Sequence, residues 1–309
     1  MKVRSITRGA LLAALTVVMA LIGTLPMGGL ILLFLPLPLI ILTYEHGLRS
    51  AVLALAVAAI LLGFLGHPSL ALTVFLFDGL VGIVMGSAMQ RGEPAWRLFG
   101  QALLAGAVGL CSMWLLSKLL FRQDVFVLTM QGFEAAITEA FKFYQGLPLA
   151  AEQLELVKQM QEAMLQLVEL AIPSLILMSI LLSLFVNFQA SRKIIALQGG
   201  SVAGLPPFAS WRLPWYLVWF FIAALLLGGA GESLFQKVNF NIYILMMFLY
   251  VLQGLAVAAH LVGRGSLSRF WQGIILALAF LFFSQILFFV GLFDTWFDFR
   301  KLDRAKRGE

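Results

Sequence analysis

Long apolar runs follow one another along most of the chain, separated by short polar or glycine- and proline-containing stretches. A hydrocarbon core of about 30 Å requires about 20 apolar residues per helix. Candidate spans of roughly this length lie at 9–26, 29–44, 50–66, 69–90, 98–120, 167–189, 214–230, 241–262 and 270–293. Pro36 and Pro38 remove backbone donors from the second of these, so we expect a broken or half-inserted helix there. The pattern predicts an all-α, polytopic membrane bundle of eight or nine transmembrane segments.

Residues 121–166 form the one substantial polar region. Apolar side chains recur in it at helical spacing, at Phe133, Ile137, Phe141 and Tyr144. This spacing predicts an amphipathic helix on the membrane surface. A second helix should begin near Pro148 and continue into the sixth span, where Pro173 would kink it. The expected divisions are an N-terminal five-segment bundle (1–120), an extracytoplasmic helical insertion (121–166), a C-terminal transmembrane bundle (167–293) and a basic tail (294–309).

Lysine and arginine are concentrated in alternate loops. They precede the first span and recur in every second loop, whereas the connections PMGG and GHPS carry none. The positive-inside rule therefore predicts a multi-pass protein of the bacterial cytoplasmic (inner) membrane with a cytoplasmic N-terminus. The tail is also basic, yet nine full spans would place it outside. Either one segment does not cross, or the tail lies on the outer surface despite its charge.

Composition agrees with a membrane protein, because 61% of the 309 residues are hydrophobic and only 12% are charged. The formal net charge of +6 arises from the loop clusters, so it indicates membrane orientation and no nucleic-acid partner. Cys111 is the single cysteine, which excludes an internal disulfide and a multi-cysteine metal site. Walker A, HExxH and GxSxG motifs are absent and the three histidines are dispersed. We expect no catalytic residue, no metal, no cofactor and no enzyme activity.

Polar residues inside the apolar runs are the main functional candidates. The intramembrane set is Asp78, Asn187, Gln253 and Gln285, with Glu232 at the lip of a loop. A carboxylate in hydrocarbon costs at least about 2.5 kcal/mol, so Asp78 in FLFDGLVGIVMG should face the bundle interior. It either lines a solute path or ties two helices together through a hydrogen bond, with Asn187 or Gln253 as its possible partner.

Small residues in two of the spans favour close helix packing. Gly79, Gly82 and Gly86 form a smooth stripe beside Asp78, along which another helix can approach closely. Ala10 and Ala14 have the same four-residue spacing in the first span.

Three later segments resemble the YybS-like family of bacterial membrane proteins, a domain of unknown function. They are LPPFASWRLPW (205–215), LQGLAVAAHLV (252–262) and GLFDTWFDFRK (291–301). The resemblance covers most of the chain, and its motif residues are Pro206, Pro207, Trp211, Arg212, Pro214, Asp294, Asp298 and Arg300. It implies no particular reaction.

The first half is similar to the substrate-binding S components of energy-coupling-factor vitamin transporters. The similarity covers about residues 5–120 and rests on ALLAAL, LPLPLIILTYEHGLRSAVLALAVA and FLFDGLVGIVMGS. It implies binding of a vitamin or metal from outside and coupling to a transmembrane subunit with two ATPases, with Ala10 and Ala14 on the coupling face. The chain departs from S components in its external helical insertion and its additional C-terminal spans.

The favoured function is therefore small-solute binding or transport in the lipid bilayer. The alternative is a membrane scaffold or interaction protein that binds other membrane proteins and no solute, with Asp78 purely structural. An enzyme that acts on lipid ranks third, because no paired catalytic residues are evident.

Overall fold

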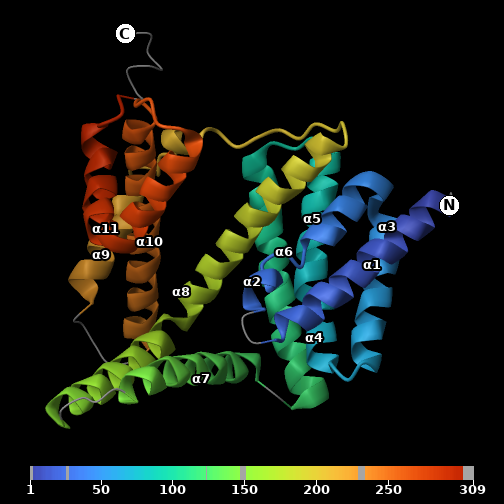
Figure 1. Ribbon diagram of the computed structural model, residues 1–309, viewed down its shortest axis with the longest axis horizontal. Coiled ribbons are helices and arrows are strands. Elements are labelled where there is room, and N and C mark those ends of the chain that lie inside the picture. Colours follow the sequence, from blue (N-terminus) through green and yellow to red (C-terminus); the bar gives the residue numbers. More distant parts are fainter. Residues whose placement is uncertain (1–2, 26–27, 123, 147–150, 229–233, 302–309) are drawn as a thin grey trace. The chain divides into compact units, whose positions relative to one another are not determined.

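The computed structural model describes residues 3–25, 28–122, 124–146, 151–228 and 234–301, and every regular element in these ranges is a helix (Figure 1). The predicted all-α fold is confirmed. Two compact units are present. The N-terminal unit comprises Met1–Val157 and Leu177–Gly204, and the C-terminal unit comprises Lys158–Ile176 and Leu205–Glu309. Residues 177–204, which we expected in the C-terminal bundle, therefore pack with the N-terminal helices.

Seven helical stretches of the described chain are long and apolar enough to cross a membrane. They are Ile6–Gly23, Gly29–Phe64, Pro68–Gln90, Ala95–Phe121, Glu152–Leu197, Leu234–Val262 and Arg269–Phe297. The chain is thus a multi-pass membrane protein, but the count differs from the expected eight or nine. The second and third expected spans fall within the single stretch Gly29–Phe64, and the seventh forms only a short apolar helix at Leu217–Leu227.

The N-terminal unit is built from helices that approach one another through small residues. Its elements are α1 (Val3–Gly23), α2 (Gly29–Leu32), α3 (Leu37–Phe64), α4 (Pro68–Thr73), the π-helical turn η1 (Val74–Asp78), α5 (Gly79–Gln90), α6 (Ala95–Leu116), the π-helical turn η2 (Ser117–Phe121) and α7 (Val125–Gln145). Helix α3 packs against both α1 and α5, and α5 packs against α6. Ala13, Ala20, Ala51 and Ala58 are buried in this core. Alanine at such positions lets backbones come close where apolar burial provides little driving force in lipid.

The second expected span is broken at its prolines, as the sequence predicts. Helix α2 ends at Leu32, and the helix resumes at Leu37 with Pro36 as its N-cap. A second break follows at Gly47, where φ is 78° and ψ is 177°. Only glycine adopts this conformation without strain. Residues 37–46 and 48–64 are therefore two helical legs, and the change of direction is visible in Figure 1.

The polar region forms α7 and the start of α8 (Ala151–Leu197). Asp124 caps α7, since its carboxylate accepts a hydrogen bond from the Phe126 N–H at 3.0 Å. The expected helix start near Pro148 lies outside the described residues, but α8 does continue through Pro173 into the membrane span. The position of α7 on a membrane surface stays a prediction.

Asn241 supports α8 beside Pro173. Its Oδ1 accepts from the Ser174 N–H at 2.8 Å, and its Nδ2 donates to the Leu170 carbonyl at 2.7 Å. These two backbone groups are the i and i+4 partners that an uninterrupted helix would join. Proline weakens a helix at this point, so the side chain of another helix bonds the exposed backbone groups.

The C-terminal unit contains the 3₁₀ turn η3 (Phe208–Ser210), α9 (Leu217–Leu227), α10 (Leu234–Val262) and α11 (Arg269–Phe297). Helices α10 and α11 form its main pair (Figure 1). Gly254 lies against the Leu287 carbonyl and Gly291 against the Tyr250 carbonyl, so no side chain fits at either crossing point. At this crossing, Gln253 of α10 forms hydrogen bonds with Gly291 and Asp294 of α11.

Candidate functional site

Asp78 lies in the interior of the N-terminal unit. It ends the π-helical turn η1, and only 5% of its surface is exposed. No hydrogen bond or ion pair joins its carboxylate to another residue in the described part of the chain. Single π-helical turns often occur at functional sites. Asp78 is thus a buried carboxylate without a protein counter-charge.

The glycine stripe beside Asp78 faces α3. A Cβ added at Gly86 would lie 2.6 Å from the Ile40 carbonyl oxygen, and one at Gly82 would lie 3.0 Å from the Pro36 oxygen. Gly79 is covered by Leu55. The three glycines therefore allow α5 to pack directly against both legs of α3.

Ala10 and Ala14 lie on the exposed face of α1, whereas Ala13 is buried in the core. The small residues that face outward are thus distinct from those that pack against α3. At the same end of this helix, Arg8 forms an ion pair with Glu45 at 2.8 Å, and His46 lies 3.5 Å from the other oxygen of that carboxylate.

Asn187 is fully buried on α8. Its Nδ2 donates to the Leu33 carbonyl at 2.6 Å and to the Ser183 carbonyl at 2.8 Å, whereas its Oδ1 has no partner in the described chain. Leu33 directly follows α2, where the helix is interrupted. Asn187 therefore satisfies a backbone carbonyl exposed by the break, and its amide nitrogen is not directed to Asp78.

A second polar group occupies the C-terminal unit around Gln253. The Gln253 Oε1 accepts from the Leu213 N–H at 2.9 Å, and its Nε2 donates to the Gly291 carbonyl at 3.0 Å. The same nitrogen lies 3.2 Å from Asp294 Oδ2 and 3.3 Å from Thr295 Oγ1. One amide therefore joins the loop before α9 to the end of α11.

An ion pair completes this group. Arg300 Nη2 lies 2.7 Å from Asp294 Oδ2, and both side chains are fully buried. Arg300 Nη1 also donates to the Ala209 carbonyl at 2.8 Å. Arg212 donates to the Thr295 carbonyl at 3.2 Å and lies 4.0 Å from the Asp298 carboxylate. We name Arg212, Gln253, Asp294, Thr295, Asp298 and Arg300 the C-terminal polar cluster.

The four expected intramembrane residues do not form one cluster. Asp78 and Asn187 belong to the N-terminal unit, and Gln253 and Gln285 belong to the C-terminal unit. Gln285 is exposed on α11, whereas Gln253 is buried within the polar cluster. Glu232 lies outside the described residues. Their positions within the apolar runs did not show which helices are neighbours.

The motif residues of the 205–215 segment surround the same cluster. Trp211 donates from its Nε1 to the Pro206 carbonyl at 3.0 Å and packs edge-on against Phe208. Pro207 precedes η3, and Pro214 lies two residues beyond Arg212 on the exposed side. A groove with a volume of about 450 Å³ adjoins them, between this loop and the Leu249–Gln253 part of α10.

Sequence reasoning missed two polar contributors, Thr295 and Asn241. Thr295 follows Asp294 directly, and Asn241 lies near the start of an apolar span. A polar side chain in a span usually faces other helices, and this signal could have identified Asn241.

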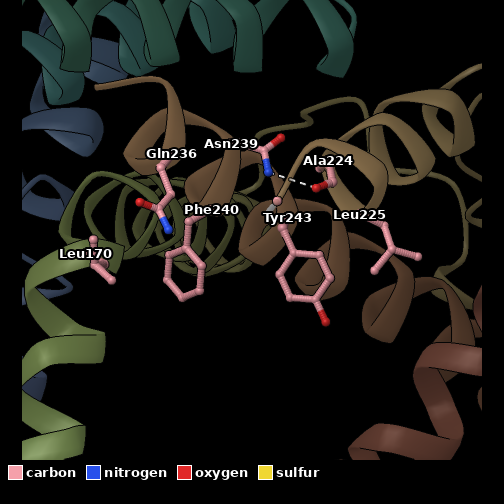
Figure 2. Close-up of a pocket in the computed structure, with 8 residues that line it drawn as sticks. Leu170, Ala224, Leu225, Gln236, Asn239, Phe240 and Tyr243 are labelled. Atoms are coloured by element: carbon pink, nitrogen blue, oxygen red, sulfur yellow. Dashed lines mark hydrogen bonds between the residues drawn. The ribbon is translucent and has the colours of Figure 1, made fainter. Parts of the chain in front are cut away.

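A further pocket lies between α8, α9 and α10 of the C-terminal unit (Figure 2). Its volume is about 230 Å³, and its lining includes Leu170, Leu225, Gln236 and Tyr243. Asn239 donates to the Ala224 carbonyl at 2.7 Å and so closes one side of the pocket. Across the described chain, no three His, Cys, Asp or Glu residues are placed to hold a metal ion.

Comparison with known proteins places the chain among uncharacterised membrane proteins. The family model described as "Predicted membrane protein (DUF2232)" matches residues 13–295. Among curated proteins, the uncharacterized protein YybS of Bacillus subtilis (strain 168) is 26% identical over 270 aligned positions, and the match covers 82% of each chain. No solved structure matches the chain.

Proposed function

The chain belongs to the DUF2232 family of predicted membrane proteins, and we propose that it binds a small solute within its N-terminal unit without catalysing a reaction. The proposal rests on Asp78, whose carboxylate is 5% exposed and has no partner in the described chain. An ionisable residue inside a membrane bundle is a functional candidate by default. A group left without an internal partner can instead bind a ligand.

The similarity of residues 5–120 to S components supports this proposal. In this arrangement the protein lies in the bacterial cytoplasmic membrane with its N-terminus in the cytoplasm. Solute would enter from outside, on the side of the bundle from which α7 extends. Ala10 and Ala14 are exposed on α1, so they are available to a transmembrane coupling subunit that works with ATPases.

A thermal stability screen of the purified full-length protein tests the proposal. Vitamins and metal ions are added singly, and a ligand at 100 times its Kd should stabilise the folded state by about 2.7 kcal/mol. Asp78→Asn should remove the stabilisation. Glu139→Gln removes an exposed carboxylate on α7 and should retain it. A flat screen with the wild-type protein would count against solute binding.

A scaffold function is the second candidate, and the groove beside the 205–215 segment favours it. The groove is lined by Trp211, Arg212 and Leu249, which combine an aromatic, a cationic and an apolar contact suited to a protein partner. Partners that co-purify with the wild-type protein and are lost with Trp211→Ala, together with a flat solute screen, would support this alternative.

A further inference from the structure

We propose that the solute bound at Asp78 carries a positive charge in the form of a compact ammonium group. This inference rests on the proposed function and specifies its substrate class. It is argued from the partners that the chain provides for the two buried carboxylates Asp78 and Asp294.

Among the described residues of the N-terminal unit, no buried side chain supplies a positive charge to Asp78. The buried polar residues described in this unit are Thr16, Thr43, Ser50, Asp78, Ser117, Asn187 and Ser191. Asp78 is the only one of them that is ionisable. Thr16, Thr43 and Ser50 donate to carbonyls one turn earlier in their own helices. Their hydroxyl protons are therefore not available to the carboxylate.

Asp294 shows how the same chain stabilises another buried carboxylate. It accepts hydrogen bonds from Arg300 at 2.7 Å, from the Phe299 N–H at 3.1 Å and from Gln253 at 3.2 Å. Burying an ionised carboxylate without such partners is strongly unfavourable. Among the described residues, no side chain pairs with Asp78 as Arg300 pairs with Asp294. A bound cationic ligand would supply the missing partner.

The packing around Asp78 limits the size of the group that reaches it. Gly79, the residue after Asp78, is covered by Leu55 of α3. Gly82, one helical turn after Asp78, lies against Leu39 of α3 and against Pro36 at its N-cap. On the other side, a Cβ at Gly109 of α6 would lie 2.5 Å from the Leu76 carbonyl oxygen. Helices on both flanks are therefore in close contact. A compact cationic group suits this site, whereas a bulky ring system does not.

Matched pairs of charged and neutral compounds test the charge requirement. The probes are ethylamine against ethanol, and choline against its neutral tert-butyl analogue. Thermal unfolding of the full-length protein is measured at constant ionic strength. We expect a cationic probe to stabilise the wild-type protein and its neutral partner to have no effect.

Variants at Asp78 link the effect to this carboxylate. Asp78→Asn should weaken binding of the effective cation at least tenfold, Asp78→Glu should retain part of it, and Glu139→Gln should bind like the wild type. Without added cation, Asp78→Asn should unfold at the same temperature as the wild type or higher, because the amide replaces a carboxyl group that has no partner in the described chain. A strongly destabilised Asp78→Asn protein would mean that Asp78 has an internal partner, and would overturn the inference.

The failure of this inference differs from failure of the proposed function. If neutral or anionic solutes stabilise the wild-type and Asp78→Asn proteins equally, solute binding stands and the cation requirement is wrong. If no compound in either screen stabilises the wild-type protein, the proposed function fails and this inference fails with it.

Discussion

The buried ion pair between Asp294 and Arg300 should be among the most sensitive positions in the C-terminal unit. We consider Arg300→Met, which keeps much of the side-chain length but removes the charge. The substitution deletes the 2.7 Å contact with Asp294 and the 2.8 Å hydrogen bond to the Ala209 carbonyl. It leaves a fully buried carboxylate facing an apolar side chain.

The expected cost follows from what remains around the carboxylate. Removing one partner of a buried pair usually destabilises a protein by about 3–5 kcal/mol, because the other charge is left uncompensated. The Phe299 N–H and the Gln253 amide still donate to Asp294. The loss for Arg300→Met should therefore lie near the lower bound, at about 3 kcal/mol. Asp294→Asn strands the guanidinium with one carbonyl acceptor and should cost about as much or more.

The double variant Asp294→Asn with Arg300→Met distinguishes pairing from simple loss of packing. Contacting residues couple by about 0.5–3 kcal/mol, so the double variant should cost clearly less than the sum of the single variants. Reversible unfolding in mixed micelles, followed by tryptophan fluorescence, measures the free energies. Single substitutions that each cost under about 1 kcal/mol, or costs that add fully, would refute the interpretation of this pair as buried and mutually compensating.

Three further predictions concern other parts of the fold. Gly86→Ala should destabilise the N-terminal unit by about 1–3 kcal/mol, because its Cβ would lie 2.6 Å from a carbonyl of α3. Gly100→Ala, where the space is open, should be neutral or stabilising in the same unfolding assay. Asn241→Leu should lower the free energy of unfolding by about 1–3 kcal/mol, because the Leu170 carbonyl and the Ser174 N–H lose their partner. The loss should be smaller when Asn241→Leu is combined with Pro173→Ala, since these two groups can then bond each other within a regular helix. A hydrogen bond from Lys118 holds the pKa of Asp124 below its ordinary 3.8. The capping of α7 by Asp124 should therefore persist above pH 3.8 and weaken as the pH falls through the lower pKa of the folded state. Hydrogen exchange of the amides at the start of α7 measures this, and exchange that does not change in acid would contradict it.

The features predicted from sequence were those that depend on local pattern. Apolar run length located the membrane-spanning helices but gave too many of them, because two expected spans form one stretch and the seventh is a short helix. Pro36 located the break before α3, because a proline lacks the donor that a helix requires at that point. The second break was not predicted. Gly47 is one of 28 glycines, and only the structure shows that its backbone takes a positive φ and redirects α3.

The features missed from sequence depend on which helices are neighbours. Gln253 and Asp294 are 41 positions apart, and nothing in the period of either span indicates that they meet. The same limit applies to Asn187, which was one of two possible partners of Asp78 but whose amide nitrogen bonds the interrupted backbone at Leu33. Periodicity indicates the face of a helix on which a side chain lies. Contacts between helices require the packing that small residues such as Gly254 and Gly291 permit.

The C-terminal polar cluster indicates a structural role for the residues of the family motif. Its three segments, 205–215, 252–262 and 291–301, contribute to a single network in which Gln253 contacts both the loop at Leu213 and the end of α11. The charges in this network are largely satisfied internally, since Arg300 pairs with Asp294 and Arg212 lies beside Asp298. Such a network holds a loop to a helix pair and retains little free bonding capacity for a solute. Substitutions in the cluster should therefore alter the stability of the C-terminal unit and leave ligand preference unchanged, whereas Asp78 should show the opposite behaviour.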